Sequence, residues 1–298
     1  MLKQCHKSFN TWILSNKTYQ EIYKNIGSPK PFDVSLRDGI QNSKNSISTN
    51  QKKKIYNIIV ETYDPPSLEV GSLVSSKILP IFSDSIDFYE YCVNNKNTDN
   101  YLLVPNLDKT IDAINISCCN LSLISSVSNS FQIKNTKKNL DQTKKEILNI
   151  VYLLNDHHKI INPKIKLYLS CINECPIEGK IDNKKIIEEI KWYYQNIKPN
   201  ILCLSDTCGS LTNSDYLNII DNSDVPYTNF GIHLHYDDKN EKEAVHILKS
   251  SFDRKISNID VSFVENGGCS VTIKNPKKNL TYDLFYKTLQ EYILEKSK

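Results

Sequence analysis

The chain has 298 residues, of which 39% are hydrophobic and 24% charged, as in an ordinary globular protein with one large core. Its net charge is only +3 and its lysines are interspersed with acidic residues, so no basic stripe is available for nucleic acid. No apolar stretch approaches the roughly 20 residues of a membrane span. We therefore expect no nucleic-acid partner and no membrane insertion.

The cysteines and the N-terminus bear on the compartment. Nine cysteines, an odd number, occur in a chain too long to depend on disulfides, and the N-terminus lacks the apolar core of a signal peptide. We therefore expect reduced thiols and a cytoplasmic protein. Residues 1–30 are rich in Lys and predict a short helical extension. A weak mitochondrial targeting segment is the alternative, disfavoured because this stretch contains no Arg.

Beyond residue 30, strand-length apolar runs alternate with segments whose apolar residues recur every three or four positions. The runs predict buried strands and the periodic segments predict amphipathic helices. The clearest helical segments are Gln51–Tyr63, Leu140–Asn155, Lys184–Asn196 and Glu241–Phe252, with a closing helix in Leu280–Lys298. The eight predicted strands are Phe32–Leu36, Ser67–Val74, Tyr101–Val104, Ala113–Ser117, Lys164–Cys171, Asn200–Ser205, Phe230–His235 and Asn258–Val264.

This alternation defines the expected fold class, which is α/β. Eight strands with intervening helices over about 260 residues predict a (β/α)8 TIM barrel. An open doubly wound sheet is the alternative, and the lack of a Gly-rich phosphate-binding sequence after the first strand weighs against it. Because no break in composition divides the region, we expect one TIM-barrel catalytic domain over residues 31–298, preceded by the extension over residues 1–30.

Unusual polar residues gather at one end of the predicted barrel. Active sites of this fold lie at the carboxyl ends of the strands. The polar residues at or near those ends are Arg37 and Asp38 after the first strand, Glu69 in the second, Asp206 after the sixth, His233 and His235 closing the seventh, and Cys269 after the eighth.

Asp38, His233 and His235 are candidate metal ligands. Residues i and i+2 of a strand point to the same side, so the two imidazoles can share a cation with the carboxylate. One carboxylate and two imidazoles with open positions suit a divalent cation, and completion by oxygen ligands favours Mg²⁺ or Mn²⁺ over structural Zn²⁺. For either histidine alone, a structural imidazole is the alternative. Gly39 is expected to allow a sharp turn after Asp38.

Arg37 and Cys269 suit the handling of a developing negative charge. Arg37 keeps its proton at working pH and offers a fixed cation to an enolate or alkoxide oxygen. The alternative is a structural salt bridge to Glu69 or Asp206. Two glycines before Cys269 permit a tight loop that presents the thiol, which is either a proton donor or an inert buried group.

Several short motifs occur together along the chain. They are Arg37–Asn42, Leu68–Val70, Val104–Asn106, Cys175–Ile181, Ser205–Gly209, His233–His235 and Gly267–Cys269. With them the chain resembles 3-hydroxy-3-methylglutaryl-CoA lyase, within the metal-dependent TIM-barrel lyases and Claisen synthases. The similarity runs from about Pro31 to Glu291.

The resemblance implies a retro-Claisen cleavage of an acyl-CoA thioester, 3-hydroxy-3-methylglutaryl-CoA, to acetyl-CoA and acetoacetate. It also implies that Asp38, His233 and His235 bind the metal together with an Asn beyond the Gly-Gly-Cys loop. Asn279 fits that position best, and Asn275 is the alternative. The other implied roles are enolate stabilisation by Arg37, proton donation by Cys269, orientation or proton transfer by Glu69 and Asp206, and CoA binding by Lys44. Such a cleavage also needs a base for the hydroxyl proton, for which Asp38 and His233 are the candidates.

Two loops depart from the family pattern, at Tyr236–Lys239 and Ser270–Lys278. Two alternatives to the lyase therefore stay open. One is a Claisen synthase or aldolase that acts on another oxo or hydroxy acid. The other is a non-catalytic barrel that acts as a binding protein. Barrels of this type often pair into dimers, so a homodimer is an open alternative to a monomer.

Overall fold

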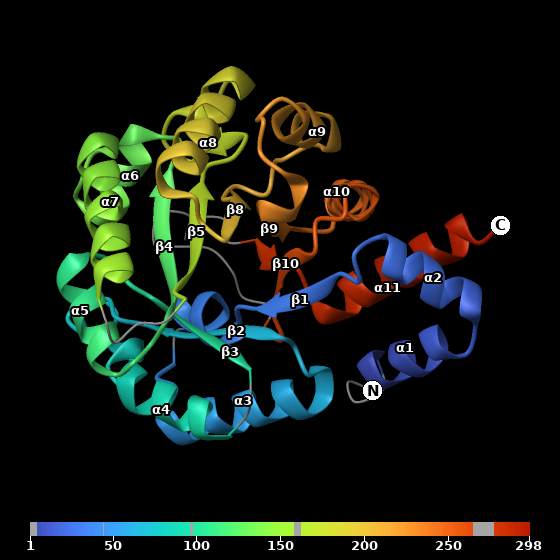
Figure 1. Cartoon of the computed structure of the whole chain (residues 1–298), viewed down its shortest axis with the longest axis horizontal. Coiled ribbons are helices and arrows are strands. Elements are labelled where there is room, and N and C mark those ends of the chain that lie inside the picture. Colours follow the sequence, from blue (N-terminus) through green and yellow to red (C-terminus); the bar gives the residue numbers. More distant parts are fainter. Residues whose placement is uncertain (1–4, 44, 96–97, 158–161, 265–276) are drawn as a thin grey trace.

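Eight parallel strands close into a barrel, which Figure 1 shows inside a ring of helices. The computed structural model describes residues 5–43, 45–95, 98–157, 162–264 and 277–298. Closure comes from the last strand, which pairs with both the first strand and the one before it. In order around the barrel the strands are β1 (Lys30–Asp33), β2 (Ser67–Ser72), β3 (Asp99–Leu103), β4 (Asn120–Ser126), β5 (Lys164–Ser170), β8 (Ile201–Asp206), β9 (Phe230–Tyr236) and β10 (Asn258–Val261).

The helices cover the outside of the barrel with their apolar faces. In α8, for example, Ile186, Ile190, Tyr193 and Ile197 recur every three or four residues and are all buried. The barrel helices are α3 (Thr49–Tyr63), α4 (Ser85–Asn95), α5 (Leu107–Asn115), α6 (Asn129–Thr136), α7 (Leu140–Asp156), α8 (Asn183–Ile197), α9 (Asn213–Asp221), α10 (Glu241–Asp253) and α11 (Tyr282–Lys296).

Three very short strands lie outside the barrel closure. A hairpin of β6 (Glu174–Cys175) and β7 (Gly179–Lys180) follows β5. The strand β11 (Lys278–Asn279) runs antiparallel to the end of β9 and places Asn279 opposite His235. This pairing brings a segment close to the C-terminus against the end of the barrel that carries the histidines.

The predicted helical extension is present as α1 (Cys5–Leu14) and α2 (Lys17–Asn25). Both helices contact α11, and Figure 1 shows them beside it. The ring of Phe9 lies 5.1 Å from that of Tyr286, and Trp12 stacks on Tyr19 at 4.5 Å. Aromatic packing therefore attaches the extension to the outside of the barrel.

The fourth strand was predicted in the wrong place. Residues 113–117 overlap the end of α5, and the strand itself is Asn120–Ser126. Asn106 caps α5, whose Thr110, Ala113 and Ile114 form its buried face, so the short apolar run belongs to a helical pattern. The true strand is interrupted by serines that are buried, and a search for near-continuous apolar runs overlooks such a sequence.

The first strand is shorter than predicted. It ends at Asp33, and residues 35–39 form a π-helical turn. The Asp33 carboxylate accepts hydrogen bonds from the Ser35 amide at 2.9 Å and from the Ser35 hydroxyl at 2.8 Å, which bends the backbone out of the extended conformation. Arg37 and Asp38 therefore lie in a helical turn beyond the strand.

Two further features concern the cysteines and the helices of the described residues. The cysteines whose side chains are described are free thiols. Within the described parts of the chain, no helix combines the length and the apolar character needed to cross a membrane.

Asp33 makes the stability of the fold depend on pH. Burial raises its pKa to about 7, and the hydrogen bonds from Ser35 and Tyr282 offset this only in part. The folded state therefore favours the protonated carboxyl, whose stabilising contribution is complete below about pH 4 and is lost as the pH rises to about 7. Between these limits Asp33 makes the free energy of unfolding fall by up to about 1.4 kcal/mol per pH unit as the pH rises. We expect Asp33→Asn to remove this contribution to the pH dependence.

The amide suits this site because both hydroxyl partners can accept as well as donate. Urea unfolding of both proteins between pH 4 and 8 measures the slope. An unchanged slope in the Asn variant would show that Asp33 is not the group that titrates.

Candidate active site

The turn that carries Arg37 and Asp38 is held tightly against the loop after β10. Both side chains are buried. The next residue must be Gly because a Cβ at Gly39 would lie 2.7 Å from the Ser262 hydroxyl and 3.0 Å from the Val264 Cβ. Gly39 is thus required by close packing of the backbone, not by the left-handed conformation expected of a sharp turn. The packing fixes the position of the Asp38 carboxylate.

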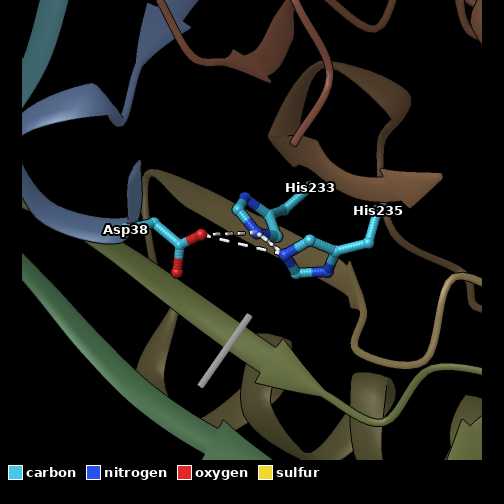
Figure 2. Close-up of side chains that lie close together, drawn as sticks. All are labelled: Asp38, His233 and His235. Carbon is cyan, nitrogen blue, oxygen red and sulfur yellow. Dashed lines mark hydrogen bonds and ion pairs between the residues drawn. The ribbon is translucent and has the colours of Figure 1, made fainter. Parts of the chain in front are cut away.

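The two histidines come from β9, on the side of the strand that faces the barrel axis. Their Nε2 atoms are 3.3 Å apart. The Asp38 Oδ2 atom lies 3.9 Å from the Nε2 of His233 and 3.8 Å from that of His235. Figure 2 shows the three side chains pointing toward one another. Among the described residues, these three side chains are the cluster that could hold a metal ion, because each offers one ligand atom and all three atoms lie within 4.8 Å of one another.

The remaining ring nitrogens have hydrogen-bond acceptors beside them. His233 Nδ1 lies 3.1 Å from Asp260 Oδ2, and His235 Nδ1 lies 3.0 Å from the backbone carbonyl of Asp206. In the tautomer assigned from these partners, each Nδ1 donates and each Nε2 presents its lone pair toward Asp38. Two lone pairs and a carboxylate directed at one small space form a donor set that suits a divalent cation.

Asn279 lies beside this group. Its Nδ2 donates to Asp38 Oδ2 at 2.9 Å, and β11 holds it opposite His235. Of the two asparagines considered from the sequence, Asn279 therefore reaches the site, while Asn275 lies outside the described residues.

Arg37 forms a buried network with two carboxylates and a tyrosine. Its Nη1 donates to Asp38 at 2.7 Å and its Nε donates to Glu69. The same Glu69 oxygen accepts from the Tyr168 hydroxyl at 3.2 Å, and the guanidinium lies 5.1 Å from the centre of the Tyr168 ring. Of the two structural partners considered for Arg37, Glu69 is therefore observed. Burial disfavours the charge on Asp38, but Arg37 and the imidazoles outweigh this and hold its pKa well below the usual range.

The second oxygen of Glu69 has a different environment. It is buried and has no hydrogen-bond partner within the described part of the chain. A carboxylate oxygen without a partner is costly in a protein interior, which is consistent with a site built to hold a further polar group.

Asp206 points away from this group. Its carboxylate accepts from the backbone amides of Ser210 and Leu211, each at 3.0 Å, and so fixes the loop that leads to α9. Burial raises its pKa to about 6, although these hydrogen bonds favour the charged form. Its backbone carbonyl lies 3.0 Å from His235 Nδ1.

Two residues with implied roles lie outside the described residues, namely Cys269 and Lys44. Conversely, three residues that contact the site were not considered from the sequence. Lys166 and Tyr168 are alternate residues of β5, and Asp260 lies within β10. A charged residue in the middle of an otherwise apolar strand was the available signal, because such a side chain must face the barrel interior and find a partner there.

A closed (β/α)8 barrel whose strand ends direct a carboxylate and two imidazoles into one space defines the class of metal-binding barrel enzymes. Comparison with known proteins agrees with this class. The HMGL-like family model matches residues 28–239, and the chain belongs to that family.

Two curated relatives are named as mitochondrial hydroxymethylglutaryl-CoA lyases. The chain is 26% identical over 258 residues to the mitochondrial hydroxymethylglutaryl-CoA lyase of Arabidopsis thaliana, covering 86% of this chain and 53%, about half, of that protein. It is 27% identical over 260 residues to the mitochondrial enzyme of Macaca fascicularis, covering 86% and 77% of the two chains. A solved HMG-CoA lyase from Acinetobacter baumannii, in complex with coenzyme A and 3-methylmalate, superimposes with a TM-score of 0.78 at 20% identity, over 89% and 84% of the two chains.

Proposed function

We propose that this protein is a divalent-metal-dependent carbon–carbon lyase that cleaves 3-hydroxy-3-methylglutaryl-CoA to acetyl-CoA and acetoacetate. The observation that carries the proposal is the convergence of Asp38, His233 and His235 beside the buried Arg37. Membership of the HMGL-like family and relatives named as hydroxymethylglutaryl-CoA lyases support it. The coenzyme A bound to the Acinetobacter baumannii protein supports a thioester substrate.

The reaction breaks the bond between the carbon that bears the hydroxyl group and the carbon next to the thioester. The hydroxyl proton leaves, and its oxygen becomes the ketone of acetoacetate. The electron pair of the broken bond passes into a thioester enolate, and a proton added to that carbon gives acetyl-CoA. When bound, Mg²⁺ or Mn²⁺ would polarise the substrate hydroxyl and lower its pKa.

The residues of this chain supply the remaining steps of the proposal. Glu69 holds Arg37 at the position where a fixed cation would stabilise the enolate oxygen. The two candidate bases remain Asp38, whose low pKa makes it a weak one, and His233, whose Nε2 could take the proton only while it is not bound to the cation. We further propose that Asn279 completes the metal site with Asp38, His233 and His235, and that Asp206 positions His235 and its neighbouring loop.

Two residue assignments rest on the resemblance rather than on contacts. Proton donation to the enolate by Cys269 and CoA binding by Lys44 are proposed for residues outside the described part of the chain. A cytoplasmic location and a homodimer stay predictions, and the Arabidopsis and Macaca relatives are mitochondrial.

An assay of acetoacetate release tests the proposed function. The protein is stripped with a chelator and then supplied with Mn²⁺ or Mg²⁺ and 3-hydroxy-3-methylglutaryl-CoA. We expect turnover that requires the added metal and yields acetoacetate and acetyl-CoA in equal amounts. Release of a thiol from acetyl-CoA with an oxo acid, without acetoacetate formation, would instead identify a Claisen synthase. Binding of metal and thioester without turnover would identify a non-catalytic barrel.

A further inference from the structure

A buried lysine–aspartate pair lies in the barrel interior beside the candidate metal site. Lys166 in β5 and Asp260 in β10 are 0% and 2% exposed, and the ammonium group donates to Asp260 Oδ1. The same ammonium lies 3.3 Å from the Asn258 Oδ1 atom and 3.3 Å from the centre of the Phe32 ring. Both charges are therefore fully enclosed by the barrel.

Burying such a pair costs free energy, because both charges lose their hydration. Barrel interiors are normally packed with branched apolar side chains, and replacing a buried ion pair by apolar groups is often neutral or stabilising. Stability alone therefore gives a poor account of Lys166 and Asp260. The contacts of the second Asp260 oxygen point to another role.

That oxygen faces His233. Asp260 Oδ2 lies 3.1 Å from His233 Nδ1, and its other neighbour is the weakly donating Cys203 thiol at 3.8 Å. For His235, by comparison, the acceptor 3.0 Å from Nδ1 is the neutral backbone carbonyl of Asp206. A carboxylate acceptor holds an imidazole N–H more strongly than a carbonyl does and raises the basicity of the opposite nitrogen.

We propose that Asp260 is a positioning residue that fixes the orientation and tautomer of His233, and that Lys166 anchors Asp260 for this purpose by engaging its other oxygen. The proposal deepens the proposed function, since it rests on His233 being a metal ligand. With Asp260 in place, Nδ1 carries the proton and Nε2 is available to the cation. Lys166 also compensates the buried carboxylate, which would otherwise be an isolated charge beside the site.

The variant Asp260→Asn tests this through proton placement. Lys166 has only donors, so the amide oxygen must turn toward it, and the amide NH₂ then faces His233 Nδ1. That arrangement forces Nδ1 to accept and puts the proton on Nε2, where it opposes a cation. We expect Mn²⁺ affinity to fall about 10- to 100-fold, measured from the free Mn²⁺ signal in an EPR titration, and the ¹⁵N spectrum of His233 to report the other tautomer.

A double variant separates positioning from a general loss of packing. In the double variant Asp260→Asn with Lys166→Met, the lysine ammonium group is gone. The amide oxygen of Asn can then accept a hydrogen bond from His233 Nδ1. We expect this second substitution to recover part of the lost Mn²⁺ affinity. If the single variant fails to fold, the double variant, which buries no charge, is compared with Lys166→Met alone. Mn²⁺ affinity no better in the double variant than in Asp260→Asn, or no lower than in Lys166→Met where that comparison is used, would overturn the proposal.

A matched control uses another buried lysine. Lys52 of α3 is 2% exposed and donates to Asp84, on the outside of the barrel. We expect Asp84→Asn to lower the unfolding midpoint while leaving Mn²⁺ affinity unchanged, and equal losses of affinity in both variants would contradict positioning by Asp260. The outcomes also separate from those of the proposed function. Wild-type protein that binds Mn²⁺ but releases no acetoacetate refutes the lyase and leaves this test intact.

Discussion

Replacing Asp38 by Ala is expected to abolish measurable Mn²⁺ binding and, with it, acetoacetate release. Asp38 is the one carboxylate in the group of three residues, and without it only the two imidazoles remain. Loss of a residue that only supports a metal ligand lowers metal affinity about 10- to 100-fold. We expect the loss of Mn²⁺ affinity in Asp38→Ala to be larger than this. EPR titration with Mn²⁺ and the metal-supplemented lyase assay measure the two effects.

The fold should survive this change, because Arg37 keeps its contact with Glu69 when Asp38 is removed. A matched control is Asp221→Ala, which breaks the ion pair with Arg254 on the outside of the barrel. Partly exposed pairs of this kind contribute about 0–1 kcal/mol, so the control should bind Mn²⁺ as the unchanged protein does. Unaltered Mn²⁺ affinity in Asp38→Ala would mean that the three side chains meet without holding a cation.

The two-residue periodicity of a strand was enough to predict that Asp38, His233 and His235 lie close together. A histidine pair at i and i+2 faces one side of any strand, and all parallel strands of a barrel end on the same rim. That argument requires only that the strand containing His233 and His235 is predicted correctly. The observed strand β9 does contain both histidines. The error in the fourth strand did not disturb the prediction, since β4 supplies none of the three residues.

The sequence could not predict how the interior polar groups are paired. Lys166 and Asp260 lie 94 positions apart, and their contact depends on the closed geometry of the barrel rather than on any local pattern. Asn279 reaches Asp38 because β11 pairs antiparallel with the end of β9. A strand of two residues is too short to be predicted from a sequence pattern. The π-helical turn was missed for a similar reason, because it arises where the Ser35 amide donates a hydrogen bond to the Asp33 side chain.

Replacing Arg37 by Gln is expected to lower turnover by at least about 10²- to 10³-fold, which is the usual cost of losing one donor that stabilises a developing oxyanion. Metal affinity should respond in the opposite sense. Arg37 is a cation 2.7 Å from Asp38, so its removal frees the carboxylate for another cation and should leave Mn²⁺ affinity equal or higher. Loss of turnover with metal binding retained distinguishes Arg37→Gln from Asp38→Ala, in which both are lost.

A purely structural role for Arg37 makes a different prediction. Removing one partner of a buried ion pair costs about 3–5 kcal/mol because the other charge is left uncompensated, and Glu69 would be that charge. Pairing Arg37→Gln with Glu69→Gln relieves this cost, so the double variant should regain stability. If Arg37 acts only as a salt bridge, turnover per folded molecule returns with the stability. If it stabilises the enolate, the double variant folds and still does not turn over, because no fixed positive charge has been restored.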